Sequence, residues 1–232
     1  KFWSLLRRAI ASNRRSPVAT YAACGRSVTM GLVVGLLYWR SGGEDDQRAA
    51  SDRTGAIFFV LVNQGYSAIA SIRVFLEERT VFEHERRRGA YSTWAYFLSK
   101  TIAELPYQIL FALVFVGFSY PLAGLRRDWS AASAHAGVLV LATLVAESLA
   151  LAVGAASPDA KTAVALGPAL LSISLLFAGF LVSLDSLPWT ARLLGDISLF
   201  RHAFAALLKI EFNVDRRFTC SEGDKSKIKA SL

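Results

Sequence analysis

Residues 55–76 read GAIFFVLVNQGYSAIASIRVFL, and residues 81–91 shortly after them read VFEHERRRGAY. The first stretch is long and apolar enough to cross the roughly 30 Å of hydrocarbon in a bilayer as a helix, at about 1.5 Å per residue. The second stretch is too densely charged to lie in hydrocarbon, so it must lie at the membrane surface. Together they predict a membrane helix whose charged end is accessible to a soluble protein.

Apolar residues are gathered into long blocks along this chain instead of being scattered. The 232 residues are 53% hydrophobic, with a mean hydropathy of +0.38. Backbone groups in lipid must be hydrogen-bonded within the chain, and no alternating pattern suggests a barrel, so helices are the expected structure. We therefore predict an all-α polytopic membrane bundle with spans at residues 21–39, 55–76, 105–122, 134–156 and 163–184.

Lysine and arginine alternate between the loops in a way that predicts which side each loop faces. Residues 1–17, which read as an amphipathic interfacial helix, carry five basic residues, and residues 77–100 also carry five, against three in the loop after the first span. Basic residues accumulate on the cytosolic side, so we place both segments there and residues 185–232, with short re-entrant helices, outside. The net charge of +8 then reflects topology and anionic lipid, and nucleic acid is not an expected partner.

Polar and small residues inside the spans leave alternatives open. A lone carboxylate such as Glu147 costs roughly 3 kcal/mol in a membrane helix. The carboxyl group must be paired, protonated or facing a wet path. It serves either structural hydrogen bonding, which we favour, or transport, and Arg26 is a candidate partner. Gly31 and Gly35 form a Gly-x-x-x-Gly pattern that permits close approach of helices, either within the subunit or between subunits.

The two cysteines are not expected to pair with each other. Cys24 lies in the first span and Cys220 in the polar tail. If the tail is external, Cys220 either remains a free thiol or pairs with a cysteine outside these 232 residues.

The order of the short motifs resembles that of one transporter family. Phe82, Glu85, Gly89 and Tyr91 form a Phe-x-x-Glu-x-x-x-Gly-x-Tyr pattern, and Glu104-Leu105-Pro106 opens the third span. The chain resembles the transmembrane domain of the G subfamily of ATP-binding cassette exporters, the White and multidrug-resistance half-transporter type. It departs from that family's pattern where proline, tyrosine and asparagine are usual, at Leu199, His202 and Ile210.

The resemblance implies roles for three groups of residues. The charged hinge would be a coupling helix that contacts an ATPase domain, although a cluster that only sets topology is the alternative. Spans two and five would line a substrate cavity, with Tyr66 stacking on flat apolar substrates; the alternative is polar contact between helices. The implied residues are Phe82, Glu83, Glu85, Arg86, Arg87 and Arg88 for coupling, Asn63, Gln64, Tyr66, Ile69, Leu171, Ser172 and Leu175 for substrate, and Phe180 and Leu181 for an apolar gate.

The resemblance also implies partners. No Gly-x-x-x-x-Gly-Lys-Ser/Thr phosphate loop occurs, so we expect no catalytic residue here and place ATP and Mg²⁺ in a nucleotide-binding domain upstream in the same polypeptide. A sixth span and a second half-transporter, identical or different, are also expected. The implied function is ATP-driven export of lipids, sterols or amphipathic small molecules by alternating access, across the plasma membrane or else an organelle membrane.

Two other function classes make different demands on the sequence. An ATP-independent secondary transporter or channel would show charged residues along a pathway and inverted repeats. This sequence has one acid deep inside a span and no evident repeat. A membrane-embedded enzyme would need clustered reactive groups, whereas His84, His135 and His202 are dispersed.

Overall fold

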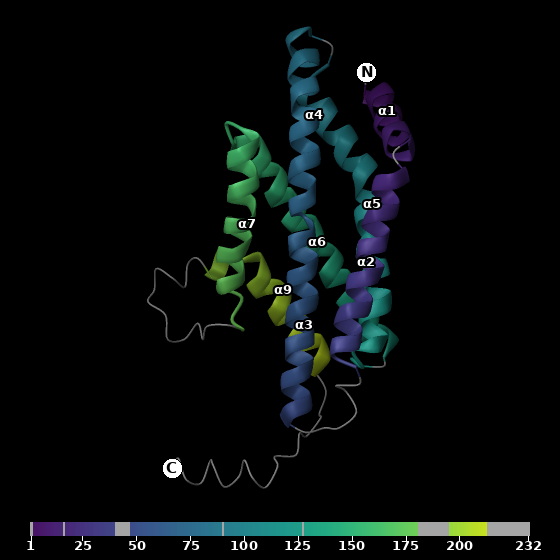
Figure 1. Ribbon diagram of the computed structural model, residues 1–232, viewed down its shortest axis with the longest axis vertical. Helices are drawn as coiled ribbons and strands as arrows, with labels where there is room; N and C mark the ends of the chain where they lie inside the picture. Colours follow the sequence, from purple (N-terminus) through teal and green to yellow (C-terminus); the bar gives the residue numbers. More distant parts are fainter. Residues whose placement is uncertain are drawn as a thin grey trace.

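The computed structural model describes residues 2–15, 17–39, 47–89, 91–126, 128–180 and 195–212. These residues form a bundle of helices, and no strand occurs among them (Figure 1). This confirms the predicted all-α polytopic bundle. The helices are α1 Phe2–Arg15, α2 Pro17–Leu37, α3 Gln47–Ser67, α4 Ile69–Arg87, α5 Thr93–Leu122, α6 Trp129–Ala156, α7 Ala160–Leu176 and α9 Leu199–Phe212.

Four stretches are long and apolar enough to cross a membrane, namely Thr20–Leu37, Ala49–Arg87, Thr93–Leu122 and Trp129–Ala156. The predicted span 163–184 coincides with a shorter apolar helix, α7, which has 17 residues. Residues 181–184 lie outside the described part of the chain, so the fifth crossing stays a prediction. The third span is longer at its start than 105–122, because Ser92 caps α5 by accepting a hydrogen bond from the Ala95 amide (3.3 Å).

The predicted span 55–76 consists of parts of two helices instead of one. α3 and α4 lie end to end as a single rod in Figure 1, with a break at Ala68. At the break, the Ser67 hydroxyl donates to the Gln64 carbonyl (2.7 Å), a side-chain bond that competes with the helical ladder. The rod, residues 47–87, is about 62 Å long at 1.5 Å per residue, which exceeds the hydrocarbon thickness and carries its charged end beyond the membrane.

α2 packs along α5 through the two glycines of the Gly-x-x-x-Gly pattern. A Cβ atom on Gly31 would lie 3.0 Å from the Phe115 carbonyl oxygen, and one on Gly35 would lie 2.5 Å from Leu122 Cβ. The absence of side chains therefore permits the close approach of these helices. Of the two alternatives, the structure assigns this pattern to packing within the subunit.

Alanine at Gly35 is expected to destabilise the protein by about 1–3 kcal/mol, because the added methyl overlaps Leu122 and pushes α2 away from α5. Gly25 on the same helix is the matched control, since nothing lies within 4 Å of a Cβ placed there. Thermal unfolding of the detergent-purified protein measures both. Equal midpoints for the two variants would contradict the intrasubunit packing.

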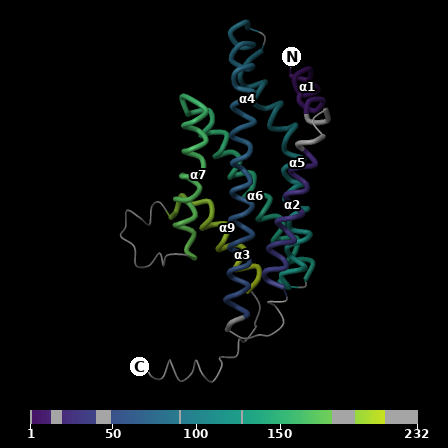
Figure 2. Tube along the Cα trace, viewed as in Figure 1, coloured from purple at the N-terminus to yellow at the C-terminus, as the bar shows by residue number. Residues whose placement is uncertain are grey.

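α9 packs into the bundle through one apolar face. Phe200, Ala203, Phe204 and Leu207 follow helical spacing and are all buried. The helix lies against α3, α6 and α7, and Figure 2 shows it crossing between α7 and α3. A Cβ on Gly65 of α3 would come within 2.5 Å of the Phe200 ring, so α9 is held closely against α3 near its break.

Candidate functional site

The charged end of α4 contacts the amphipathic helix α1. Arg8 donates from both terminal nitrogens to the two carboxylate oxygens of Glu85, each at 3.0 Å. The Tyr91 hydroxyl donates to the same carboxylate at 2.6 Å. This two-pronged geometry fixes both distance and orientation between the helices. Residues 1–17 and 77–100 therefore meet at one end of the bundle.

Glu85 remains ionised over an extended pH range because of these donors. It lies at the charged tip of the rod, outside the predicted span 55–76. The hydrogen bonds from Arg8 and then from Tyr91 hold the pKa of the Glu85 carboxyl below its usual value. The same contact raises the pKa of the Arg8 guanidinium. The pair is therefore fully charged at neutral pH and available as an electrostatic link.

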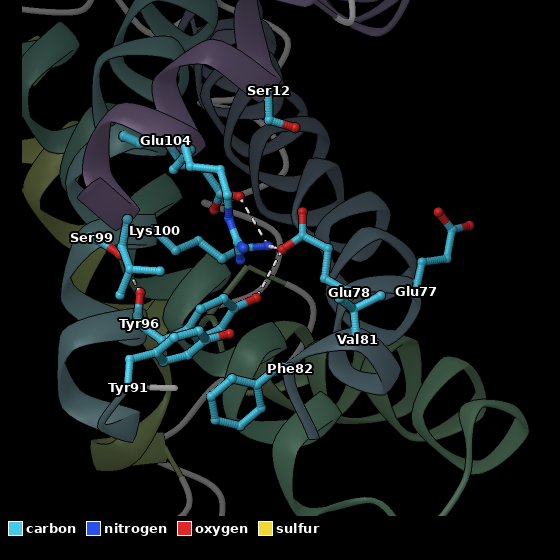
Figure 3. Close-up of a pocket in the computed structure, with 14 residues that line it drawn as sticks. Ser12, Glu77, Glu78, Val81, Phe82, Tyr91, Tyr96, Ser99, Lys100 and Glu104 are labelled. Atoms are coloured by element: carbon cyan, nitrogen blue, oxygen red, sulfur yellow. Dashed lines mark hydrogen bonds and ion pairs between the residues drawn. The ribbon is translucent and has the colours of Figure 1, made fainter. Parts of the chain in front are cut away.

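A second polar contact joins α4 to α5. Lys100 pairs with Glu78 and with Glu104, the latter at 3.3 Å, and Tyr96 donates to Glu78 at 3.0 Å (Figure 3). The Phe82 ring stacks on Tyr96 with centroids 4.5 Å apart. These groups border a cavity of about 370 Å³ between α1, α4 and α5. Ionic and aromatic contacts thus hold the three helices together.

Arg79 extends the linkage to α6. Its terminal nitrogen donates to the carbonyls of Gly154 (3.1 Å) and Ser157 (2.7 Å), and its Nε donates to Glu83 (2.9 Å). The two carbonyls lie at the C-terminal end of α6, where helical acceptors lack partners and a cation is favourable. The C-terminal end of α4 therefore contacts α1, α5 and α6 directly. A displacement of this end would be transmitted to all three helices.

The residues predicted to couple the chain to a partner fall into two sets. Phe82, Glu83 and Glu85 make the contacts just described inside the chain. The basic residues Arg86, Arg87 and Arg88 are exposed at the tip of α4. The structure thus separates a part that can transmit force from a part that is open to a soluble partner.

The polar residues predicted in span two gather beside the break in the rod. Asn63, Gln64 and Tyr66 border a cavity of about 160 Å³ between α2, α3, α5 and α6. The Tyr66 hydroxyl lies 2.7 Å from the hydroxyl of Ser172 on α7. Ser172 also donates to the Pro168 carbonyl, so Tyr66 donates to Ser172. The two spans predicted to contact substrate are thus joined by a hydrogen bond.

The other residues predicted to contact substrate pack into the subunit core. Leu171 is buried, and Ile69 and Leu175 are half-buried against the same apolar cluster. Their contact with a ligand would need a cavity that forms in another conformation or against a second copy. The structure therefore brings Asn63, Gln64 and Tyr66 together around the polar cavity, joins Ser172 to Tyr66 by a hydrogen bond, and packs the leucines and Ile69 into the core.

An aromatic cluster lies at the opposite end from the charged hinge. Phe180, after α7, stacks on Phe58 of α3 with centroids 4.3 Å apart, and both rings meet Phe204 of α9 edge to face, at 5.9 and 6.0 Å. Gly179 has φ +88°, a conformation that glycine adopts readily, and it turns the chain toward this cluster. Leu181, the second predicted gate residue, lies outside the described residues.

A buried ion pair near the aromatic cluster was not predicted from the sequence. Arg53 of α3 and Glu211 of α9 are each 1% exposed, with Arg53 Nη1 3.8 Å from Glu211 Oε1. The Arg126 amide donates to Glu211 Oε2 at 3.1 Å, linking the α5–α6 connection to the pair. A signal was present, because Glu211 follows Leu207 by four residues on the buried face of α9, where an acid needs a partner.

Glu147 and Arg26, considered as partners from the sequence, border the same cavity as Asn63 and Gln64. Glu147 is buried within α6, whereas Arg26 is exposed on α2. Cys24, two residues before Arg26, is a half-buried free thiol, and Cys220 lies outside the described residues.

Comparison with known proteins assigns the family. Residues 1–212 match the model of the ABC-2 type transporter family. The chain is 33% identical to ABC transporter G family member 7 of Arabidopsis thaliana, over 92% of the chain and 29% of that protein. It is also 30% identical to the broad substrate specificity ATP-binding cassette transporter ABCG2 of Rattus norvegicus, over 90% of the chain and 32% of that protein.

A third relative is Protein white of Drosophila melanogaster, 33% identical over 90% of the chain and 30% of that protein. The chain thus spans about three tenths of the length of these relatives. With its apolar helices it is an integral multi-pass membrane protein. The motif pattern, the helical bundle and these matches agree: the chain is a transmembrane domain of the ABC-2 type transporter family, of the kind found in the G subfamily of ATP-binding cassette transporters.

Proposed function

We propose that this domain is the membrane-spanning part of an ATP-driven exporter that moves lipids, sterols or amphipathic small molecules by alternating access. The nucleotide-binding domain, with its ATP and Mg²⁺, belongs upstream in the same polypeptide. A second half-transporter, identical or different, completes the translocation pathway. The plasma membrane is the proposed location.

One observation carries the proposal: the charged end of α4 is tied to three other helices by oriented polar contacts. Arg8–Glu85, Lys100–Glu78 and the Arg79 contacts with α6 all lie at that end. A push from an ATPase domain on the exposed arginines would move α1, α5 and α6 together, because packed helices shift between discrete arrangements and do not deform continuously. A cluster that only set topology would need none of the acidic partners.

The substrate class is supported by the mixed chemistry beside the break in the rod. Tyr66 offers an aromatic face, while Asn63 and Gln64 offer polar contacts. Such a combination suits molecules with an apolar body and a polar end. The relative from Rattus norvegicus is named for broad substrate specificity, which agrees with recognition by few and adaptable contacts.

The aromatic cluster of Phe58, Phe180 and Phe204 supports the proposed gate. Three rings in mutual contact form an apolar cluster that joins α3, α9 and the residues after α7, and such contact is the kind that an apolar gate requires. ATP-driven closure at the charged end would separate α7 from α3 and open the cluster. Nucleotide must supply the difference between the states, because a substrate with equal affinity for both conformations shifts neither.

The proposal is tested by reconstituting the full polypeptide in liposomes and measuring ATP hydrolysis and substrate uptake across a panel of lipids, sterols and amphipathic drugs. Hydrolysis stimulated by members of the panel, together with nucleotide-dependent transport, is the expected result. Transport that proceeds without nucleotide would show an ATP-independent transporter instead.

Alanine at Tyr66 is expected to change which compounds stimulate hydrolysis, with a shift of about tenfold in half-stimulating concentration for flat aromatic compounds, since it removes a stacking face. Phenylalanine keeps that face and loses only the bond to Ser172, so its shift is expected to be smaller. Tyr21→Ala, at a tyrosine 75% exposed on α2, is the matched control. An unchanged stimulation profile for Tyr66→Ala would remove this residue from the substrate site.

A further inference from the structure

The small polar cavity beside Glu147 has a chemistry that the proposed transport function does not explain. We propose that it binds the protonated amine end of an amphipathic substrate, with the Glu147 carboxylate as acceptor. This inference rests on the proposed function and adds to it a preference for cationic compounds.

The unsatisfied carboxylate oxygen is the first observation. Glu147 is 9% exposed on α6, and among the described residues its Oε2 atom has no hydrogen-bond donor. Ser71 of α4 lies beside the same carboxyl group, so the second oxygen is the one left over. Burial disfavours the charged form of a carboxyl group, so the carboxylate is stabilised when a cationic donor binds beside it and compensates both its charge and its hydrogen bond.

The size and lining of the cavity are the second observation. Its volume of about 160 Å³ accommodates an aminomethyl group or about five water molecules, and not the apolar body of a substrate. The amides of Asn63, Gln64 and Gln108 and the hydroxyl of Thr143 border the same space. An ammonium group has three donors, so one carboxylate and two amide oxygens can satisfy it.

Arg26 is the competing cation, and its position leaves room for a ligand. It borders the cavity but is exposed, whereas Glu147 is buried. Among the described side chains, no nitrogen of Arg26 lies within ion-pair distance of the Glu147 carboxylate. A long arginine side chain near the inner third of a span reaches the headgroups readily. Arg26 thus weakens the attraction for a cation without satisfying the carboxylate.

The cavity also adjoins the residues proposed to contact substrate. Asn63 and Tyr66 border it, and Tyr66 reaches Ser172 on α7. A ligand with its apolar body against the Tyr66 ring can therefore place a terminal amine beside Glu147. This arrangement orients an amphipathic cation across the junction of α3 and α4.

Direct binding tests the inference without any need for nucleotide or transport. The protein is placed in nanodiscs of neutral phosphatidylcholine at pH 7, and the affinities of dodecylamine and dodecanol are measured by calorimetry against empty nanodiscs. The two probes share the same chain and differ only in the charged end. We expect the amine to bind at least about tenfold more tightly than the alcohol, as a charged hydrogen bond implies.

Glu147→Gln keeps the shape of the side chain and is expected to reduce the amine preference to about threefold or less. Glu77→Gln is the matched control, because it removes the same charge from an exposed position outside this cavity, and it should retain the preference. Arg26→Gln should strengthen amine binding, since it removes the competing cation. If Glu147→Gln does not fold, Gln108→Leu serves in its place and should weaken amine binding several-fold while leaving the alcohol unchanged.

Equal affinities for the two probes in the wild type would overturn the inference. So would a full amine preference in Glu147→Gln, which would assign this carboxyl a structural role only. The two proposals can fail separately. If the full polypeptide shows no ATP-driven transport but still prefers the amine in a way that depends on Glu147, the proposed function is overturned and the binding site stands.

Discussion

Replacing Glu85 with alanine is expected to abolish substrate stimulation of ATP hydrolysis in the full polypeptide, with a loss of about tenfold or more in the stimulated rate. The carboxylate accepts two bonds from Arg8 and one from Tyr91, so alanine removes the link between the charged end of α4 and α1. Charged hydrogen bonds of this kind are the stronger ones in proteins. The measurement is ATPase activity in liposomes with and without a stimulating compound.

The design of this experiment separates coupling from folding. Arg8→Ala should give the same loss, and the double variant should be no worse than either single one, since both remove one interaction. Glu77→Ala removes an exposed acid from the same helix and is expected to keep stimulation. Normal stimulation in Glu85→Ala would mean that force enters the membrane domain elsewhere.

Alanine at Glu211 is expected to destabilise the protein by about 3–5 kcal/mol, because it removes the counter-charge of a fully buried arginine. It also removes the acceptor of the Arg126 amide, so the α5–α6 connection loses its contact with α9. Thermal unfolding in detergent, followed by the fraction that remains monodisperse, measures the change.

Asp196→Ala is the matched control for this effect. Asp196 pairs with Arg201, near the start of α9, but its side chain is 61% exposed, and such pairs contribute less than about 1 kcal/mol. Similar unfolding midpoints for the two variants would show that the buried ion pair contributes no more to stability than the exposed one. A large loss of stability in Glu211→Ala alone would support the conclusion that the Arg53–Glu211 pair holds α9 in the bundle.

The membrane class, and the presence of helices long and apolar enough to cross a membrane, followed from the sequence, because hydrophobic blocks of bilayer length are a local property of the chain. Short helices in residues 185–232 were also expected, whereas the packing of α9 against α3, α6 and α7 was not. The break at Ala68 was not, since residues 55–76 have the length and hydropathy of a single span.

The make-up of the candidate sites depended more on tertiary structure than the fold class did. Asn63, Gln64 and Tyr66 were identifiable because amides and hydroxyls in lipid need partners. Their actual neighbours come from segments distant in sequence, such as Ser172 and Glu147. The position of Glu211 on the buried face of α9 indicates that it needs a partner, but no local pattern identifies that partner as the distant Arg53.

The sequence by itself determined that this chain is a helical membrane domain with a charged segment after its second predicted span, since hydropathy and charge act residue by residue against the bilayer. Only the tertiary structure decided that Gly31 and Gly35 pack within the subunit, that Glu85 meets Arg8, and that Glu147 faces a polar cavity. These contacts arise from the way whole helices pack, and packing is set by the shapes of many side chains at once.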